Sequence, residues 1–286
     1  MRRLYTGLAV AALVALIAVG CGRSRASDAK DTATTGALQG KLVITGSSTV
    51  APLANEIARR FVEQHPDVQI DVQTGGSSRG VADAHAGLAD IGMASRKLKA
   101  SEAELTAHTI ARDGICLIVH ADNPLATLDA DQVRAIWRGE ITRWSQLGGQ
   151  DAPITVVHKA EGRSTLELFL AYFALTNKET KPTVIIGDNE AGIKTVAGNP
   201  QAIGYVSIGA AEYSASQKVP IRLLPMAGVE PTAATVAAGT YPLSRPLNLV
   251  TREATPTGLA AAYIAFAQSA AVHDLVEDLY VVPLAP

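Results

Sequence analysis

Short apolar runs alternate with amphipathic stretches along the chain from residue 41 onward. Runs at residues 41–44, 68–72 and 90–94 are short and bounded by turn residues, which indicates strands. Between them, apolar residues recur at helical spacing over residues 52–62 and 81–88. Strands that alternate with helices are typical of an α/β fold with a mainly parallel sheet.

A longer extended run at residues 110–119, followed by a break at Asn123 and Pro124, separates this pattern from a second one. The second pattern predicts further strands at residues 154–157, 183–186 and 202–206, and helices at residues 129–138, after Thr165 and at 189–196. Residues 219–223 are predicted to cross back to the first part, where residues 247–250 add a strand and residues 257–279 add helices. We therefore predict two lobes, the first of which is built from both ends of the chain.

The amino terminus has the features of an export signal. Arg2 and Arg3 precede an apolar stretch at residues 8–19, and Cys21 follows small residues. This border resembles a bacterial lipobox, in which the cysteine becomes the lipidated first residue; a plain secretory signal with a chance cysteine is the alternative. Residues 24–40 are polar and small, which predicts a flexible tether.

The predicted organisation therefore has five segments. They are a lipoprotein signal peptide at residues 1–20, a tether at 21–40, lobe I at 41–117 and 220–286, and lobe II at 118–219. A lipidated Cys21 would anchor the protein to a bacterial membrane, in the periplasm or at the cell surface.

Composition narrows the classes of function. The chain has 286 residues and a formal net charge of −2, so no broad basic field is present for nucleic acid. Six histidines are scattered without metal-ligand spacing, and we predict neither a metal nor a cofactor. Cys116 lies alone in an apolar run, which predicts a buried, unreactive thiol.

Hydroxyl residues occupy three predicted turns from a strand into a helix. The turns begin at Gly46, Gly76 and Gly162. Helix amino termini carry unpaired N–H groups and partial positive charge, and in parallel sheets they gather at the carboxyl ends of the strands. Ser164 or Thr165 as an ordinary N-cap is the alternative for a single turn of this kind. The repetition favours a cleft for a small tetrahedral oxyanion.

Donor chemistry selects the candidate ligand residues. Hydroxyls and turn amides donate single hydrogen bonds, whereas lysine and arginine add charge-assisted ones. The candidates are Ser48, Thr49, Ser77, Ser78, Ser95, Arg96, Lys159, Arg163, Ser164 and Thr165. We expect Glu161 to orient Lys159 or Arg163.

These motifs, in this order, resemble the PstS-type periplasmic phosphate-binding proteins. The resemblance extends from residue 41 to the end and rests on residues 46–52, 76–78, 94–96, 161–165 and 241–247. It implies a two-lobed type II periplasmic binding protein fold that closes on inorganic phosphate and delivers it to an ABC permease in the inner membrane. It also implies ligand contacts from Ser48, Thr49, Ser77, Lys159, Arg163, Ser164 and Thr165, and we expect a monomer.

Two departures from the family pattern bear on specificity. Many members place an Asp after the serine of the third strand, as an acceptor for the proton of the ligand; this chain has Arg96 there. The family also tends to have Arg at the position of Lys159, and Ser-Gly-Thr where this chain has Arg163, Ser164 and Thr165. A lysine does not reproduce the bidentate geometry of arginine. Sulfate or molybdate is therefore an alternative ligand.

Two other classes of function stay open. A sensor that binds the anion and docks on a signalling partner would need the same closing motion as a transport component. A secreted hydrolase is disfavoured, because the chain has neither a Gly-x-Ser-x-Gly elbow nor a His-Glu-x-x-His pair, and we predict no catalytic residue.

Overall fold

The computed structural model describes residues 38–279 and 281–284. The predicted signal segment, Cys21 and the tether up to residue 37 lie outside the described residues, so the predictions made for them stay predictions. The described chain has a mixed α/β fold in which helices flank one continuous path of strands.

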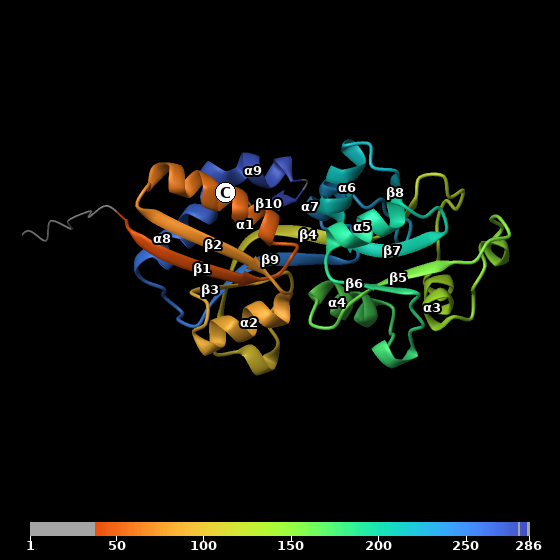
Figure 1. Ribbon diagram of the computed structural model, residues 1–286, viewed down its shortest axis with the longest axis horizontal. Coiled ribbons are helices and arrows are strands. Elements are labelled where there is room, and N and C mark those ends of the chain that lie inside the picture. The colour runs from red at the N-terminus through yellow and green to blue at the C-terminus, as the bar shows by residue number, and fades with distance from the viewer. Residues whose placement is uncertain (1–37, 280, 285–286) are drawn as a thin grey trace, which may run out of the picture. The chain divides into compact units, whose positions relative to one another are not determined.

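The first part of the chain forms three parallel strands. β1 (Gly40–Gly46) lies between β2 (Val68–Thr74) and β3 (Ile91–Ala94). The linking helices are α1 (Ala51–Gln64) and α2 (Ser77–Ala86). Figure 1 shows α1 on one face of this sheet, together with the carboxyl-terminal helices α8 (Gly258–Ala267) and α9 (His273–Asp278), and α2 on the other face.

Two long antiparallel strands connect the first part of the sheet with the second. β4 (Thr106–His120) pairs along its first part with β9 (Ser244–Thr251) and with β10 (Val282–Pro283). The rest of β4 pairs with β7 (Ala202–Ser207) and β8 (Ile221–Leu224). β4 is therefore a member of both parts of the sheet, as Figure 1 shows.

The second part repeats the parallel arrangement. β5 (Thr155–Lys159) lies between β7 and β6 (Val184–Ile186). Its helices are α3 (Ala130–Arg138), α4 (Ser164–Tyr172), α5 (Asn189–Ala197), α6 (Ile208–Ser216) and α7 (Ala233–Ala237). Short 3-10 turns lie at Ala100–Glu102, Trp144–Leu147, Asn177–Glu179 and Ala270–Val272.

The buried apolar residues fall into two main clusters. One cluster, around Ile44, Phe61 and Tyr263, packs on β1, β2 and β3. The other, around Trp137 and Phe169, packs on β5 and β7. We call the elements around these clusters the first half and the second half of the described chain. Each half buries enough apolar surface to position the turns that follow its strands.

Most strands and helices predicted from apolar spacing are confirmed, but helix α7 and strand β10 were not predicted, and two further differences concern β8 and α6. The segment predicted to cross back at residues 219–223 is β8, but it pairs with the far end of β4 and belongs to the second cluster; the return comes with β9. Helix α6 was not predicted, because it begins directly after β7 with no connecting loop: Ser207 is the last residue of the strand and also the N-cap of the helix, where it accepts the N–H of Ala210. The exact lobe boundaries stay predictions.

Two single features complete the description of the fold. Cys116 is fully buried and unpaired, as predicted, and burial raises the pKa of its thiol well above the ordinary value. Within residues 38–279 and 281–284, no single helix has the length and apolar character to cross a bilayer; α8 with the residues up to Asp278 passes only as a pair bent by 68°.

Candidate functional site

Four buried serines from different strand ends and turns meet in the interior. Ser47 follows β1, Ser77 begins α2, Ser95 follows β3, and Ser164 begins α4 of the second half. Ser95 Oγ lies 2.6 Å from Ser164 Oγ and 2.9 Å from Ser47 Oγ, and Ser77 Oγ lies 3.1 Å from Ser164 Oγ. Each of the four is at most 2% exposed. We call these four residues the hydroxyl cluster.

The hydroxyls of Ser77 and Ser164 are directed into the cluster because neither residue caps its helix. The N-cap of α4 is Arg163 and that of α2 is Gly76, and neither makes a side-chain capping bond. Interpreting Ser164 or Thr165 as an ordinary N-cap is therefore wrong. Both helices begin beside this region, and a helix leaves its first-turn N–H groups without intrahelical acceptors; that of Ser78 donates to the carbonyl of Gly162 at 3.2 Å.

A buried ion pair lies beside the hydroxyl cluster. Arg245 donates from Nε and Nη2 to Asp113 Oδ2, at 3.1 and 2.8 Å, and the N–H of Gly209 donates to Asp113 Oδ1 at 3.2 Å. The side chains of Arg245 and Asp113 are 1% and 0% exposed. A pair this deeply buried needs further hydrogen bonds to offset its desolvation, and Asp113 obtains one from the start of α6.

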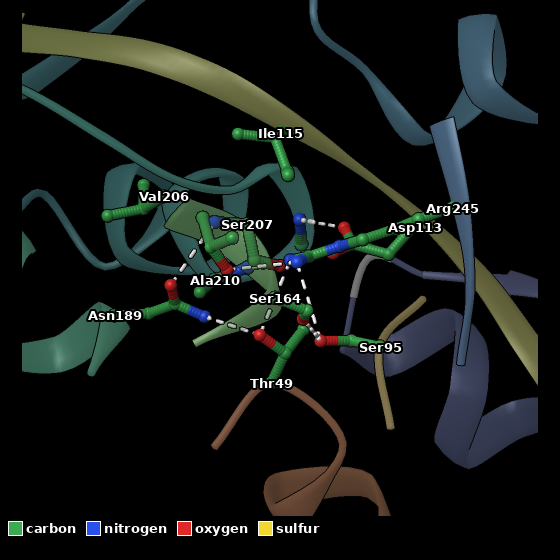
Figure 2. Close-up of polar contacts among 12 residues, drawn as sticks. Thr49, Ser95, Asp113, Ile115, Ser164, Asn189, Val206, Ser207, Ala210 and Arg245 are labelled. Carbon is green, nitrogen blue, oxygen red and sulfur yellow. Dashed lines mark hydrogen bonds and ion pairs between the residues drawn. The ribbon is translucent and has the colours of Figure 1, made fainter. Parts of the chain in front are cut away.

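Arg245 also reaches the hydroxyls. Its Nη1 donates to Thr165 Oγ1 at 2.9 Å and to Ser95 Oγ at 3.4 Å, and its Nη2 donates to Thr49 Oγ1 at 3.3 Å. Figure 2 shows the guanidinium of Arg245 held against Asp113 and directed toward Ser95, Ser164 and Thr49. This cation therefore joins hydroxyls of both halves.

Sequence reasoning missed Arg245, Asp113 and Ser47 as site residues. A signal was present for the pair: Asp113 interrupts an apolar strand, and Arg245 stands in the residue 241–247 motif that carries the family resemblance. A charge inside a buried strand requires a partner. Because Asp113 and Arg245 are 132 residues apart in the sequence, the sequence did not indicate that Arg245 is the partner of Asp113.

Lys159 lies near the hydroxyl cluster but is engaged elsewhere. Its Nζ donates to the backbone carbonyl of Asp188 at 2.5 Å and to Asn189 Oδ1 at 3.1 Å. Asn189 Nδ2 in turn donates to Thr49 Oγ1 at 3.2 Å. Burial lowers the pKa of Lys159 to about 7; Asp188 opposes this shift, and Arg245 and Arg163 add to it. The ammonium group thus supports a contact between the halves.

Arg96 and Ser78 are directed away from the hydroxyl cluster. Arg96 donates to both oxygens of Glu102, at 2.7 and 2.8 Å, and its Nε lies 3.2 Å from Glu167 of α4. Ser78 Oγ donates to Glu167 at 3.2 Å. The structure therefore gives these two residues protein partners.

Three other residues named from the sequence lie at the edge of the site. Arg163 is half-buried and packs over Gly76, and its side chain makes no hydrogen bond or ion pair with residues 38–279 or 281–284. Ser48 is half-buried and lines an adjoining groove. The expectation for Glu161 is wrong, because its carboxylate accepts from Asn177 rather than holding Lys159 or Arg163.

A groove of about 700 Å³ adjoins the site. Thr49, Asn189 and Ser207 line it, and the same residues take part in the hydrogen bonds around Arg245 and Lys159. The groove is much larger than one small oxyanion and meets the site at Thr49 and Asn189; the four serines of the hydroxyl cluster do not line it.

The arrangement is suited to holding an anion rather than to transforming one. Hydroxyls and a guanidinium converge, which supplies donors for a tetrahedral oxyanion. His158 lies behind the site, where it bonds to Trp137, Tyr205 and Asn177, and burial lowers its pKa. A neutral histidine fixed by these bonds is a structural residue here.

Comparisons with known proteins agree with this geometry. A family model described as a PBP superfamily domain matches residues 31–271. The phosphate-binding protein PstS of Bacillus subtilis is 31% identical over 277 residues, which cover 94% of this chain and 90% of that protein. The chain belongs to the PstS family of phosphate-binding proteins, within the PBP superfamily.

Solved structures extend the likeness to the fold. A structure from Clostridium perfringens, solved as a phosphate ABC transporter substrate-binding protein with bound phosphate, has a TM-score of 0.79 and 33% identity; the match covers 86% of this chain and all of that one. An ABC-type phosphate transport receptor from Vibrio cholerae has a TM-score of 0.70 and 31% identity, over 85% of this chain and all of that one. The two-lobed fold predicted from the resemblance is thereby confirmed.

Proposed function

We propose that this protein captures inorganic phosphate between its two halves and delivers it to an ABC importer. It acts as an extracytoplasmic solute-binding protein, without catalysis. Family membership supports this role, because relatives at 31% and 33% identity are described as phosphate-binding or as phosphate transporter components. Cys21, in this proposal, carries the lipid that anchors the protein to its membrane.

One observation carries the proposal: hydroxyls from both halves and one buried guanidinium converge within hydrogen-bond distance. Ser95 and Ser164 come from opposite halves and their Oγ atoms are 2.6 Å apart. Buried hydroxyls that donate mainly to one another have few partners of full strength, whereas an oxyanion accepts several charge-assisted bonds at once. Phosphate would take over these donors when it binds.

The proposed ligand set follows from where each donor lies. The direct donors are Thr49, Ser77, Ser95, Ser164, Thr165 and Arg245, with Arg163 at the edge as a cation that is not committed to an acid within the described residues. Lys159 supports Asn189 instead of pointing into the hydroxyl cluster. Ser48, Ser78 and Arg96 are not in this set, because Ser48 lines the groove and the other two bond to glutamates.

Titration of tryptophan fluorescence tests the proposal directly. The indole N–H of Trp137 donates to His158, and the next residue on β5 is Lys159, which supports a contact between the halves. Closure of the halves should therefore change the fluorescence emission of Trp137. Phosphate added to phosphate-free protein should give a saturable change, and calorimetry should give the same dissociation constant. Phosphate at millimolar concentration with no signal and no heat would contradict the proposed function.

Sulfate is a second candidate ligand, favoured by one observation. The position at which many family members have a ligand-facing Asp is Arg96 here, and Arg96 is paired with Glu102. Asp113 has its oxygens occupied by Arg245 and Gly209. Because the carboxylates of Glu102 and Asp113 are already engaged by arginines, sulfate should compete measurably with phosphate. A titration in a hundred-fold excess of sulfate that leaves the phosphate affinity unchanged would exclude this alternative.

A further inference from the structure

Glu167 in helix α4 connects the second half with three groups of the first half. One of its oxygens, Oε2, lies 3.2 Å from Arg96 Nε and 3.0 Å from Lys99 Nζ. Its other oxygen, Oε1, accepts from Ser78 Oγ at 3.2 Å. The contacts with Arg96 and Lys99 are ion pairs between the halves, and they lie outside the hydroxyl cluster.

The segments that carry these contacts are the same ones that carry the proposed ligand donors. Glu167 lies one helical turn after Ser164, and Arg96 directly follows Ser95. Ser164 and Ser95 are in direct contact. Any motion that separates Ser95 from Ser164 must therefore also pull Glu167 away from Arg96 and Lys99.

The charge arrangement is asymmetric. Arg96 is 4% exposed and keeps Glu102, of its own half, at 2.7 Å. Its Nε makes no hydrogen bond with the described residues, although Glu167 Oε2 lies 3.2 Å away as an ion-pair partner. If the halves separated, Arg96 would keep its ion pair with Glu102. Glu167, in contrast, would lose its ion pairs with both Arg96 and Lys99. Glu167 is thus the carboxylate whose partners depend on the closed arrangement.

We infer that Glu167, Arg96 and Lys99 form an electrostatic clasp that keeps the two halves closed over the bound anion and so slows its release. This inference rests on the proposed function. The clasp does not touch the ligand. Its residues are positioning residues, which act by stabilising one arrangement of the halves relative to another. It also gives Arg96 a role other than the ligand contact predicted from the sequence.

A clasp at this place should affect dissociation more than association. The ion pairs form only when the halves meet, so their removal should leave the encounter with phosphate unchanged. Glu167 is 28% exposed and Lys99 is 49% exposed, so dissolved salt screens part of the interaction. The effect should therefore be larger at low ionic strength.

Stopped-flow tryptophan fluorescence with inorganic phosphate tests the clasp. Glu167→Gln should raise the dissociation rate constant by about 3- to 20-fold at low salt and leave the association rate constant within about two-fold. The matched control is Glu63→Gln, which removes a glutamate paired with Arg59 of the same helix, at 2.7 Å. The control should leave both rate constants unchanged.

A double-mutant cycle separates the clasp from a general effect on folding. Lys99→Gln alone should raise the dissociation rate by a smaller factor, and adding it to Glu167→Gln should have almost no further effect. If Glu167→Gln does not fold, Lys99→Gln still carries the test through the salt dependence of its dissociation rate.

The outcomes distinguish the clasp from the proposed function. If the unmodified protein binds phosphate but Glu167→Gln releases it at the unmodified rate, the clasp is absent while the function stands. If the effects of the two substitutions simply add, the ion pair is not the cause. If the unmodified protein does not bind phosphate at all, the proposed function fails first.

Discussion

Asp113 fixes which nitrogen atoms of Arg245 are available to a ligand. Nε and Nη2 donate to the same carboxylate oxygen, so Nη1 faces Thr165 and Ser95, while Nη2 also reaches Thr49. A lysine at this position could hold either the carboxylate or the hydroxyls, but its single ammonium group cannot reproduce the planar fork. The specific requirement for arginine is therefore a matter of geometry as well as charge.

Replacement of Arg245 tests this requirement. Arg245→Lys should weaken phosphate binding by about 2–4 kcal/mol, because one of the buried partners loses its donor. Calorimetry gives the affinity, and thermal melting shows that the variant is folded. Arg252→Lys is the control, since Arg252 is exposed. Unchanged affinity in Arg245→Lys would remove this residue from the site.

Lys159 gives a prediction of pH dependence. Its pKa in the folded protein is about 7, whereas the ordinary value is 10.5. Below pH 7 both the folded and the unfolded chain hold the proton; between pH 7 and 10.5 only the unfolded chain does. Because the unfolded state then binds more protons, the free energy of unfolding rises with pH in this window. The penalty for a buried ammonium is present below pH 7 and is relieved above it.

The measurement compares the native chain with Lys159→Gln in phosphate-free buffer from pH 6 to 9.5. The difference in unfolding free energy, obtained from urea titrations, should move in favour of the native chain by up to about 1.4 kcal/mol per pH unit above pH 7. Contributions from all other titrating groups cancel in this difference. A difference that is flat over the whole range would mean that Lys159 keeps its ordinary pKa.

At the scale of elements, two glycine turns let the halves approach. Gly76 and Gly162 both have positive φ, 99° and 79°, and Ser78 N donates to the carbonyl of Gly162 at 3.2 Å. A Cβ built on Gly76 would lie 2.7 Å from that carbonyl oxygen and 2.9 Å from Arg163 Cδ. The amino termini of α2 and α4 can therefore meet only when Gly76 has no side chain.

Gly76→Ala should separate these two helix ends. We expect a loss of roughly 1–3 kcal/mol of stability from backbone strain, together with at least a ten-fold loss of phosphate affinity. Gly239→Ala is the control, because Gly239 also has positive φ, 70°, but has open space around it. Gly239→Ala should lower the stability of the protein but leave its phosphate affinity unchanged. Equal affinities in the two variants would show that the approach of the turns is not needed for binding.

At the scale of the whole described chain, β4 and β9 make the two halves interdependent. β4 has 15 residues and pairs with β9 and β10 at one end and with β7 and β8 at the other. Unfolding of one half would remove hydrogen bonds and apolar contacts from the same strand in the other half. We therefore expect the halves to unfold together.

Differential scanning calorimetry tests this cooperativity. A single transition is expected in phosphate-free buffer, and phosphate at 100 times its dissociation constant should raise Tm by about 5–10 °C, because it binds only the folded chain. Chloride at equal ionic strength is the control. Two separate transitions would contradict the shared role of β4, and a single transition without a shift would contradict phosphate binding.

The sequence alone predicted most strands and helices and the turns where ligands gather. Apolar spacing is a local signal, and hydroxyls such as Ser77 and Ser164 in the first turn of a helix are placed by the same local geometry. For that reason the candidate hydroxyls could be named before any contact between the halves was known. Helix α6, which lacks a clear apolar stripe and a loop separating it from β7, gave no such signal.

Only the tertiary structure decided which charges lie among those hydroxyls. Arg96 was named as a ligand residue but pairs with Glu102 and Glu167, whereas Arg245, 150 residues from Ser95, reaches the hydroxyls. The positions of the turns follow from local periodicity. A long charged side chain pairs with whichever residues folding brings within a few ångströms of its charged end. Those residues can come from any part of the chain, so local periodicity does not indicate them.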